Sequence, residues 1–154
     1  MCGARAPTLE RKLGLAAKVQ DEIGHAQLLY RLLADLGVSV DEALARLRSG
    51  RAKFHWFFHF LAEDWAATGM IAWLSDMAAA IAQGDLAGGS YAPYRRALAK
   101  ICWEEQFHIS YGHEVVRALA QGTAVQRAMV QNALDLWWPR LLAFNGPPTR
   151  REDD

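Results

Sequence analysis

Apolar residues recur at helical spacing along most of the chain, and no stretch alternates in the way that is typical of strands. The apolar spacing, the capping residues and the glycine stops together predict an all-α fold. Thr8 and Thr123 are the expected N-caps of the first and last long helices. We expect four long helices, which span residues 8–36, 63–83, 93–121 and 123–144.

The segments between and around these helices are also interpretable. Ser39 and Glu42 form a capping box for a short helix that ends near Gly50. Residues 51–62 are rich in aromatic side chains without a clean period, which indicates an ordered crossover loop. Residues 1–7 are interpreted as a loop remnant and residues 146–154 as a tail, so the sequence predicts one helical domain over residues 1–154.

Two copies of Glu-x-x-His lie inside the predicted long helices, as Glu22/His25 and Glu105/His108. The i, i+3 spacing puts each carboxylate beside an imidazole on one helix face, in the middle of an apolar arc. Burying a charge there without a partner costs several kcal/mol, and a metal ion offsets that cost. Two such pairs, with a carboxylate from each of two further helices, make the ligand set of di-iron helical bundles. The alternatives are two satisfied Glu–His pairs in the core, or solvated faces.

Three other positions bear on this hypothesis. Asp76 is the only acid in the interior of the third predicted helix and is framed by small residues, which suits a metal ligand; the alternative is a surface acid. Lys18 precedes Glu22 by one turn and could pair with it or with another carboxylate; the alternative is an exposed lysine. His55 and His59 have His-x-x-x-His spacing without an adjacent glutamate, which is weak support for a zinc site.

Composition narrows the classes of function. The 154 residues carry 17 basic and 17 acidic side chains, with no basic block, so binding to nucleic acid or to an anionic membrane is not indicated. The two cysteines form no disulfide framework, which fits a reducing cytoplasm. Charged residues interrupt the apolar stretches before the ~20 residues of a membrane span. We therefore expect a soluble cytoplasmic protein.

Several stretches resemble the catalytic component of the ring-1,2-phenylacetyl-CoA epoxidase, the oxygenase of phenylacetate degradation. They follow in the same order over almost the whole chain and are Arg5-Ala-Pro-Thr-Leu, Lys18-Val-Gln-Asp-Glu-Ile-Gly-His25, Trp73-Leu-Ser-Asp76, Ser90-Tyr-Ala-Pro-Tyr94, Ile101-Cys-Trp-Glu-Glu-Gln-Phe-His108, Met129-Val-Gln131, Trp137-Trp-Pro139 and Gly146-Pro-Pro148.

The resemblance implies a ferritin-like fold and a bacterial multicomponent monooxygenase that activates O₂ at a di-iron centre. It also implies that the partner is a homologous structural subunit, hence an oligomer, and that a flavin/iron–sulfur reductase delivers electrons. The substrate would be phenylacetyl-CoA. Lys18 matches a family lysine beside the site and is assigned a catalytic role. The implied metal ligands are Glu22, His25, Asp76, Glu105 and His108.

The chain departs from the family pattern in ways that affect the expected activity. The first ligand glutamate of the family lies on a helix upstream of Arg5, and the family chain continues beyond Pro148. Within the match, Ala67 stands in place of an aspartate and Leu61 in place of a proline. We therefore expect a ferritin-like bundle that lacks the first ligand-bearing helix.

Three functions remain open on the sequence. The chain could be the core of the oxygenase's catalytic component, with little epoxidation on its own because one ligand glutamate is missing. It could instead be a truncated paralogue that binds partner subunits without chemistry. The third is a small ferritin-like metal binder that completes its site by dimerising.

Overall fold

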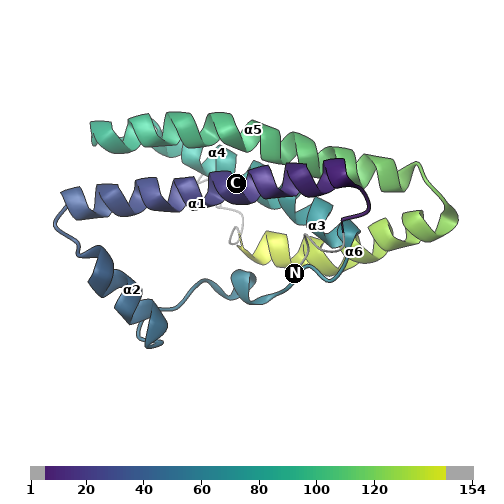
Figure 1. The fold of residues 1–154 in the computed structure, drawn as a ribbon, viewed down its shortest axis with the longest axis horizontal. Coiled ribbons are helices and arrows are strands. Elements are labelled where there is room, and N and C mark those ends of the chain that lie inside the picture. Colours follow the sequence, from purple (N-terminus) through teal and green to yellow (C-terminus); the bar gives the residue numbers. More distant parts are fainter. Residues whose placement is uncertain (1–5, 145–154) are drawn as a thin grey trace, which may run out of the picture.

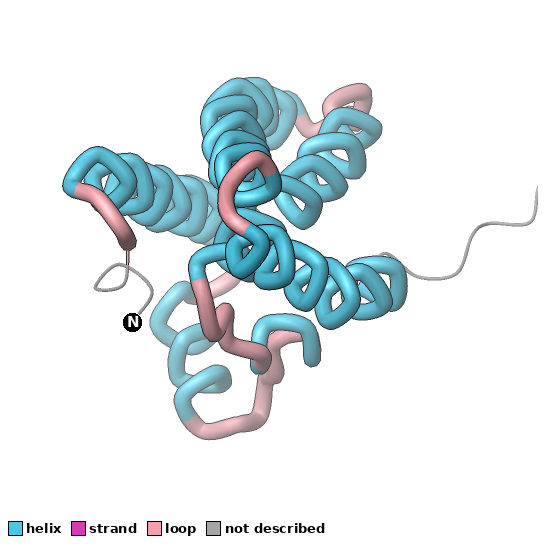
Figure 2. The backbone as a smooth tube through the Cα atoms, turned by 90° about the vertical axis from the view of Figure 1, so that its right-hand side faces the viewer, coloured by secondary structure: helices cyan, strands magenta, loops and turns pink. Residues whose placement is uncertain are grey.

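The computed structural model describes residues 6–144, and all regular elements in that part of the chain are helical, as predicted (Figure 1). Figure 2 shows the same helices, in cyan, from a direction turned by 90°. The predicted tail and most of the predicted loop remnant lie outside the described residues. The elements are α1 (Leu9–Asp35), α2 (Val40–Arg48), the 3₁₀-helix η2 (Trp56–His59), α3 (Trp65–Met70), the π-helical η3 (Ile71–Ser75), α4 (Asp76–Leu86), α5 (Ala92–Ala120) and α6 (Ala124–Phe144).

Side-chain caps fix where the helices begin. The Thr8 hydroxyl accepts a hydrogen bond from the backbone N–H of Arg11, and the Thr123 hydroxyl accepts one from that of Gln126. The third long helix begins two residues later than predicted. There the Asp64 carboxylate accepts the N–H of Ala67 at 2.7 Å, so the helix starts at Trp65.

The two helices that carry the Glu-x-x-His motifs pack antiparallel. The Tyr111 hydroxyl donates a 2.6 Å hydrogen bond to the carbonyl of Arg11. Further along, His25 of α1 contacts Glu104 of α5 at 3.0 Å. Residue numbers therefore rise along α1 while they fall along α5, and Figure 1 shows the two helices side by side. This arrangement brings the two motifs to the same level of the bundle.

Glycines let α5 approach the segment that carries Asp76. A Cβ on Gly112 would lie 2.3 Å from the backbone nitrogen of Trp73 and 2.7 Å from the carbonyl oxygen of Gly69. A Cβ on Gly69 would lie 2.7 Å from the Val115 side chain. The backbones of α5 and η3 are thus in direct contact, one turn away from both Asp76 and His108.

The π-helical turn Ile71–Ser75 changes which face of the third helix is buried. Met70 and Met77 would lie about 20° apart on a straight α-helix. In the structure Met70 is 2% exposed and Met77 is 38% exposed. The wider π-helical turn contains one more residue than an α-helical turn, so the side chains after it are rotated about the helix axis. Asp76 is the first residue of α4, directly after this turn.

The combined segment Trp65–Leu86 is long and apolar enough, by length and composition alone, to cross a membrane. Asp76 interrupts this segment, as the sequence analysis expects, and Asp85 is its other charged residue; the length-and-composition test tolerates two charges. The core helix of a soluble protein passes the same test, and this segment packs against α5 and α6 inside the bundle. Packing is a sufficient reason for its apolar composition.

The main apolar core lies between α3, α5 and α6 and is closed by the crossover loop. Trp137 is 1% exposed, and Phe57 of the loop stands edge-on to its indole ring at 5.6 Å. By contrast, α1 buries only His25. Large apolar side chains on α1 are exposed, and these are Leu9, Leu13, Val19, Ile23, Leu29 and Leu33. The helix is held by polar contacts at Lys18 and His25, together with Leu15, which packs against the cluster around Tyr111.

Candidate metal centre

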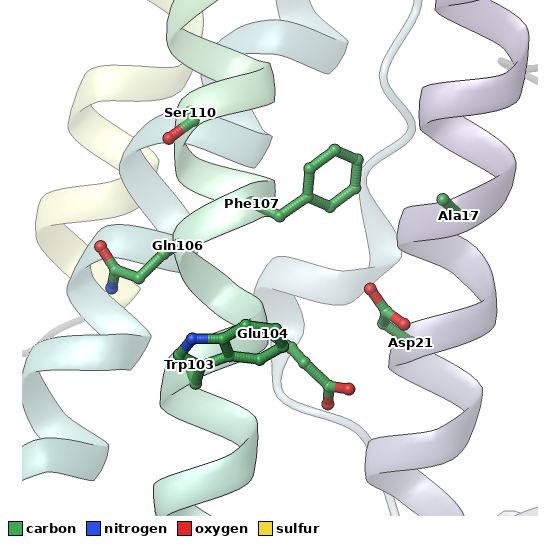
Figure 3. A pocket seen from close by; sticks show the side chains of 7 residues that line it. All are labelled: Ala17, Asp21, Trp103, Glu104, Gln106, Phe107 and Ser110. Atoms are coloured by element: carbon green, nitrogen blue, oxygen red, sulfur yellow. The ribbon is translucent and has the colours of Figure 1, made fainter.

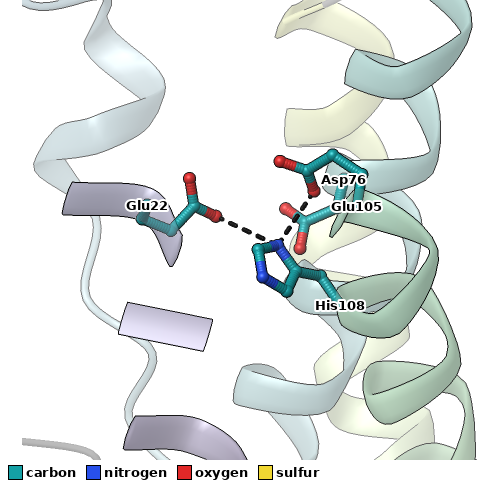
Figure 4. Close-up of side chains that lie close together, drawn as sticks. All are labelled: Glu22, Asp76, Glu105 and His108. Atoms are coloured by element: carbon teal, nitrogen blue, oxygen red, sulfur yellow. Dashed lines mark hydrogen bonds and ion pairs between the residues drawn. The ribbon is translucent and has the colours of Figure 1, made fainter. Parts of the chain in front are cut away.

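Four of the five predicted ligands converge on one point between the helices (Figure 4). Glu22 of α1, Asp76 of α4, and Glu105 and His108 of α5 each offer a ligand atom within 4.8 Å of the others. His108 and Glu105 are buried, and the Asp76 side chain is 14% exposed, so the alternative of a surface acid is wrong. The Glu22 side chain is 45% exposed and forms the open side of the cluster.

His25, the fifth predicted ligand, lies beside this cluster. Its Nδ1 is 3.4 Å from Oε1 of Glu105 and 3.6 Å from Oε2 of Glu22. On the other side, Nδ1 of His108 is 3.0 Å from Oε2 of Glu105 and 3.5 Å from Oε1 of Glu22. Each glutamate therefore presents one oxygen to each imidazole. Carboxylates and imidazoles arranged in this way could hold metal ions.

Lys18 lies inside the cluster. Its ammonium is 2.5 Å from Oε1 of Glu22, 2.6 Å from Oδ2 of Asp76 and 3.3 Å from Nδ1 of His108. The side chain is 14% exposed, so the alternative of an exposed lysine is wrong. The ammonium provides a positive charge where three carboxylates meet.

The electrostatics of the cluster follow from burial and from Lys18. Burial raises the pKa of Asp76 to about 6 and outweighs the attraction of the neighbouring ammonium. Burial also opposes the charge of Lys18, but Asp76 and Glu22 overcome this and raise its pKa above the usual 10.5. For Glu22, the hydrogen bond from Lys18 overcomes burial and lowers the pKa. For His108, burial is overcome mainly by Glu105, and the pKa is raised.

Two further acids contact the site, and the motif spacing alone does not predict them. Oδ2 of Asp21 lies 3.2 Å from Nε2 of His108, and Oε2 of Glu104 lies 3.0 Å from Nε2 of His25. Each acid directly precedes the glutamate of a Glu-x-x-His motif, which is the signal in the sequence that could have identified them.

The remaining histidines do not join the cluster. His55 caps the N–H of Phe57 and packs against the Phe144 ring at 4.9 Å, so it belongs to the crossover loop. Among the described residues, neither His55 nor His59 belongs to a group that could hold a metal ion. The His113 side chain is 46% exposed and contacts the Trp73 ring.

A cavity of about 380 Å³ opens beside the cluster. Its polar wall includes Lys18, Glu22, Asp76 and Glu105, and its other walls carry aromatic rings from the crossover loop and α6, namely Phe57, Phe58, Phe60, Trp137 and Phe144. The buried indole nitrogen of Trp137 has no hydrogen-bond partner in the part of the chain that the structure describes. The cavity thus combines an aromatic lining with the carboxylate cluster.

Comparison with known proteins agrees with this site. The profile of the phenylacetic acid catabolic protein family matches residues 2–153. One component of the 1,2-phenylacetyl-CoA epoxidase from Escherichia coli (strain K12) is 46% identical over 144 residues, which cover 93% of this chain. They cover 46% of that protein, so the chain spans about half the length of the curated relative it matches. The match confirms the predicted resemblance and, with the all-helical structure, the ferritin-like bundle. The chain belongs to the phenylacetic acid catabolic protein family.

Proposed function

We propose that the chain forms the metal-binding core of the catalytic component of an oxygenase in phenylacetate catabolism, acting in the cytoplasm. Its substrate would be phenylacetyl-CoA, whose aromatic ring is epoxidised. The observation that carries the proposal is the convergence of Glu22, Asp76, Glu105 and His108 within 4.8 Å, with His25 beside them. Family membership and the 46% identity to a component of an epoxidase support the choice of reaction.

The donor set fits a pair of iron ions. Carboxylate and imidazole are ligands that iron accepts in helical bundles, and the two glutamates bridge the two imidazoles. When bound, a di-iron centre supplies the activation of O₂ and the transfer of an oxygen atom, with electrons from a separate flavin/iron–sulfur reductase. The residues that would hold it are Glu22, His25, Asp76, Glu105 and His108.

The other residues of the site have roles that follow from their contacts. Lys18 balances the charge of Glu22 and Asp76 and can hold or give a proton at Nζ. The aromatic cavity beside the carboxylates can take an apolar ring. Trp137 lines this cavity, and its buried indole N–H meets no acceptor among the described residues.

Charge counting predicts that the described residues do not complete the centre. Two ferrous ions bring four positive charges, whereas Glu22, Asp76 and Glu105 supply three negative ones. We propose that a fourth carboxylate comes from outside these residues, as the family resemblance implies. Until it is supplied, iron should bind weakly and reducing equivalents should be lost as peroxide.

Reconstitution tests this function. The 154-residue chain is combined with the homologous structural subunit, the reductase and phenylacetyl-CoA, with and without a peptide of the relative that carries the ligand helix. We expect little epoxide from the chain alone and a clear increase with the peptide. The Glu105→Gln variant should give none under either condition. Absence of product in every combination, with iron bound, would contradict the assignment to this reaction.

A second candidate function is binding to partner subunits without chemistry, and one observation favours it. The exposed apolar side chains of α1, among them Leu9, Leu13 and Ile23, form a surface suited to a protein partner. Retention of the buried Glu105–His108 pair argues against a pure scaffold, which does not need it. The metal content of the purified chain distinguishes the two functions, because a scaffold would bind the structural subunit but no iron. A small metal binder that completes its site by dimerising would bind iron only as a dimer.

A further inference from the structure

The two site histidines have the same orientation toward the cluster. In both rings Nδ1 points toward Glu22 and Glu105, and Nε2 points away from them. On the far side of each ring, Nε2 meets one more carboxylate: Asp21 for His108 at 3.2 Å and Glu104 for His25 at 3.0 Å. Neither acid belongs to the group of described residues that could hold a metal ion.

These outer contacts are crossed between the helices. Asp21 precedes Glu22 on α1 but contacts the histidine of α5, whereas Glu104 precedes Glu105 on α5 but contacts the histidine of α1. Neighbouring residues on a helix point about 100° apart. An acid beside a ligand glutamate is therefore turned away from the cluster and toward the partner helix. The antiparallel packing of α1 and α5 makes the two contacts reciprocal.

We propose that Asp21 and Glu104 are positioning residues that fix the ring and the tautomer of His108 and His25 for metal binding. The proposal rests on the metal centre proposed above. An ionised carboxylate can only accept a hydrogen bond, so each Nε2 must carry the proton. A neutral imidazole then has its lone pair on Nδ1, which faces the cluster.

The surroundings of the two acids support this role. Both line a groove between α1 and α5 together with Trp103 and Phe107, outside the cluster (Figure 3). Their side chains are 30% and 17% exposed, respectively. Lys100 donates to both oxygens of Glu104 at 2.5 Å and favours its ionised form.

The Nδ1 atom of His108 has conflicting neighbours in the absence of metal. The Lys18 ammonium at 3.3 Å favours a lone pair there, while Oε2 of Glu105 at 3.0 Å favours a proton. A bound cation removes this conflict by taking both the lone pair and the carboxylate. The metal-loaded chain is therefore the state in which the proposal is tested.

The test compares Asp21→Ala and Glu104→Ala with the conservative variants Asp21→Asn and Glu104→Gln, whose amide oxygens can still accept the N–H. Glu114→Gln is the control, since Glu114 lies on α5 and pairs with the exposed Arg117. Affinity is measured by titrating the full chain with Co²⁺, and the tautomers by ¹⁵N NMR of the Zn²⁺-loaded chain. Thermal melts of each variant confirm folding.

We expect each alanine variant to bind Co²⁺ about 10- to 100-fold more weakly than the wild type, and the amide variants to recover part of that loss. In the Zn²⁺-loaded wild type both histidines should be protonated at Nε2 and metal-bound at Nδ1. The protected Nε2–H signal of His108 should be lost in Asp21→Ala, and that of His25 in Glu104→Ala. Wild-type affinity and unchanged Nε2–H signals in folded alanine variants would overturn the proposal and leave the metal centre standing. Failure of the wild type itself to bind Co²⁺ or Zn²⁺ would overturn both.

Discussion

The ammonium of Lys18 lies 2.6 Å from Oδ2 of Asp76, although the two residues are 58 positions apart in the chain. The contact joins α1 to the first turn of α4 across the candidate metal centre. Because Lys18 also contacts Glu22 at 2.5 Å, one lysine compensates two of the three carboxylates. A metal ion that binds these carboxylates must take over that compensation.

Replacing Lys18 tests two effects of its ammonium group: stabilisation of the metal-free chain and competition with a bound metal ion. Lys18→Met should lower the free energy of unfolding of the metal-free chain by about 3 kcal/mol, because Asp76 loses its ammonium partner in a largely buried site. Co²⁺ should then raise the melting temperature of the variant more than that of the wild type, since the metal no longer competes with an ammonium. Lys12→Met, an exposed position on the same helix, is the control. A smaller Co²⁺ effect in Lys18→Met would mean that Lys18 assists binding of the metal.

The raised pKa of Asp76 predicts opposite pH dependences for stability and metal binding. Its pKa is about 6 in the folded chain, against 3.8 ordinarily. The stability that this carboxyl contributes is therefore complete below about pH 4 and is lost as the pH rises through 6. Relative to Asp76→Asn, the metal-free wild type should lose roughly 2 to 4 kcal/mol between pH 4 and pH 7.

Binding of Co²⁺ by the wild type should follow the opposite trend and weaken as the pH falls below about 6, because protons compete for Asp76. Melting curves with and without Co²⁺ at several pH values measure both effects. Asp85→Asn, an exposed acid in the same helix, should behave like the wild type. Parallel stability curves for the wild type and Asp76→Asn would contradict the burial of the charge.

Gly112 has no side chain, which allows the backbones of α5 and η3 to lie close together. A methyl group at this position should push the two segments apart. Gly112→Ala should cost about 1–3 kcal/mol of stability, because the added carbon meets backbone atoms of Trp73 and Gly69 that cannot turn aside. Since His108 lies one turn away on α5, Co²⁺ affinity should fall as well. Gly84→Ala in α4 has nothing within 4 Å and should be neutral or slightly stabilising. Equal effects of the two substitutions, measured by denaturant titration, would refute the close contact.

Much of the fold could be predicted from the sequence because its determinants are local. The caps at Thr8 and Ser39 and the turn after α5 at Gly122 act within a few residues, and the observed ends of α1, α2 and α5 lie within a residue or so of those expected. The helix α3 begins two residues after the predicted start because the Asp64 carboxylate caps it. The i, i+3 spacing places the carboxylate and imidazole of each Glu-x-x-His pair on one helix face without any tertiary contact. Asp76 has no such spacing, and its prediction rests on its small neighbours and on the family resemblance.

The rest of the site depends on relations that one helix does not contain. The π-helical turn before Asp76 has no proline to mark it in the sequence, and it lies against Gly112 of α5. The contact of Lys18 with Asp76 requires the relative placement of α1 and α4. The crossed contacts of Asp21 and Glu104 likewise require the register of α1 against α5, which spacing within either motif does not fix.

Metal content tests most directly the central claim that Glu22, Asp76, Glu105 and the two histidines hold metal ions. The chain is equilibrated anaerobically with Fe²⁺ by dialysis, and bound iron per chain is measured at rising free iron concentration. Because the group supplies only three carboxylates, we expect weak but saturable binding that approaches about two ions per chain at high free iron. Glu105→Gln should lose most of this iron, because Glu105 faces both His25 and His108, and Glu114→Gln should lose none. No saturable iron in the wild type, or equal iron in Glu105→Gln, would contradict the claim.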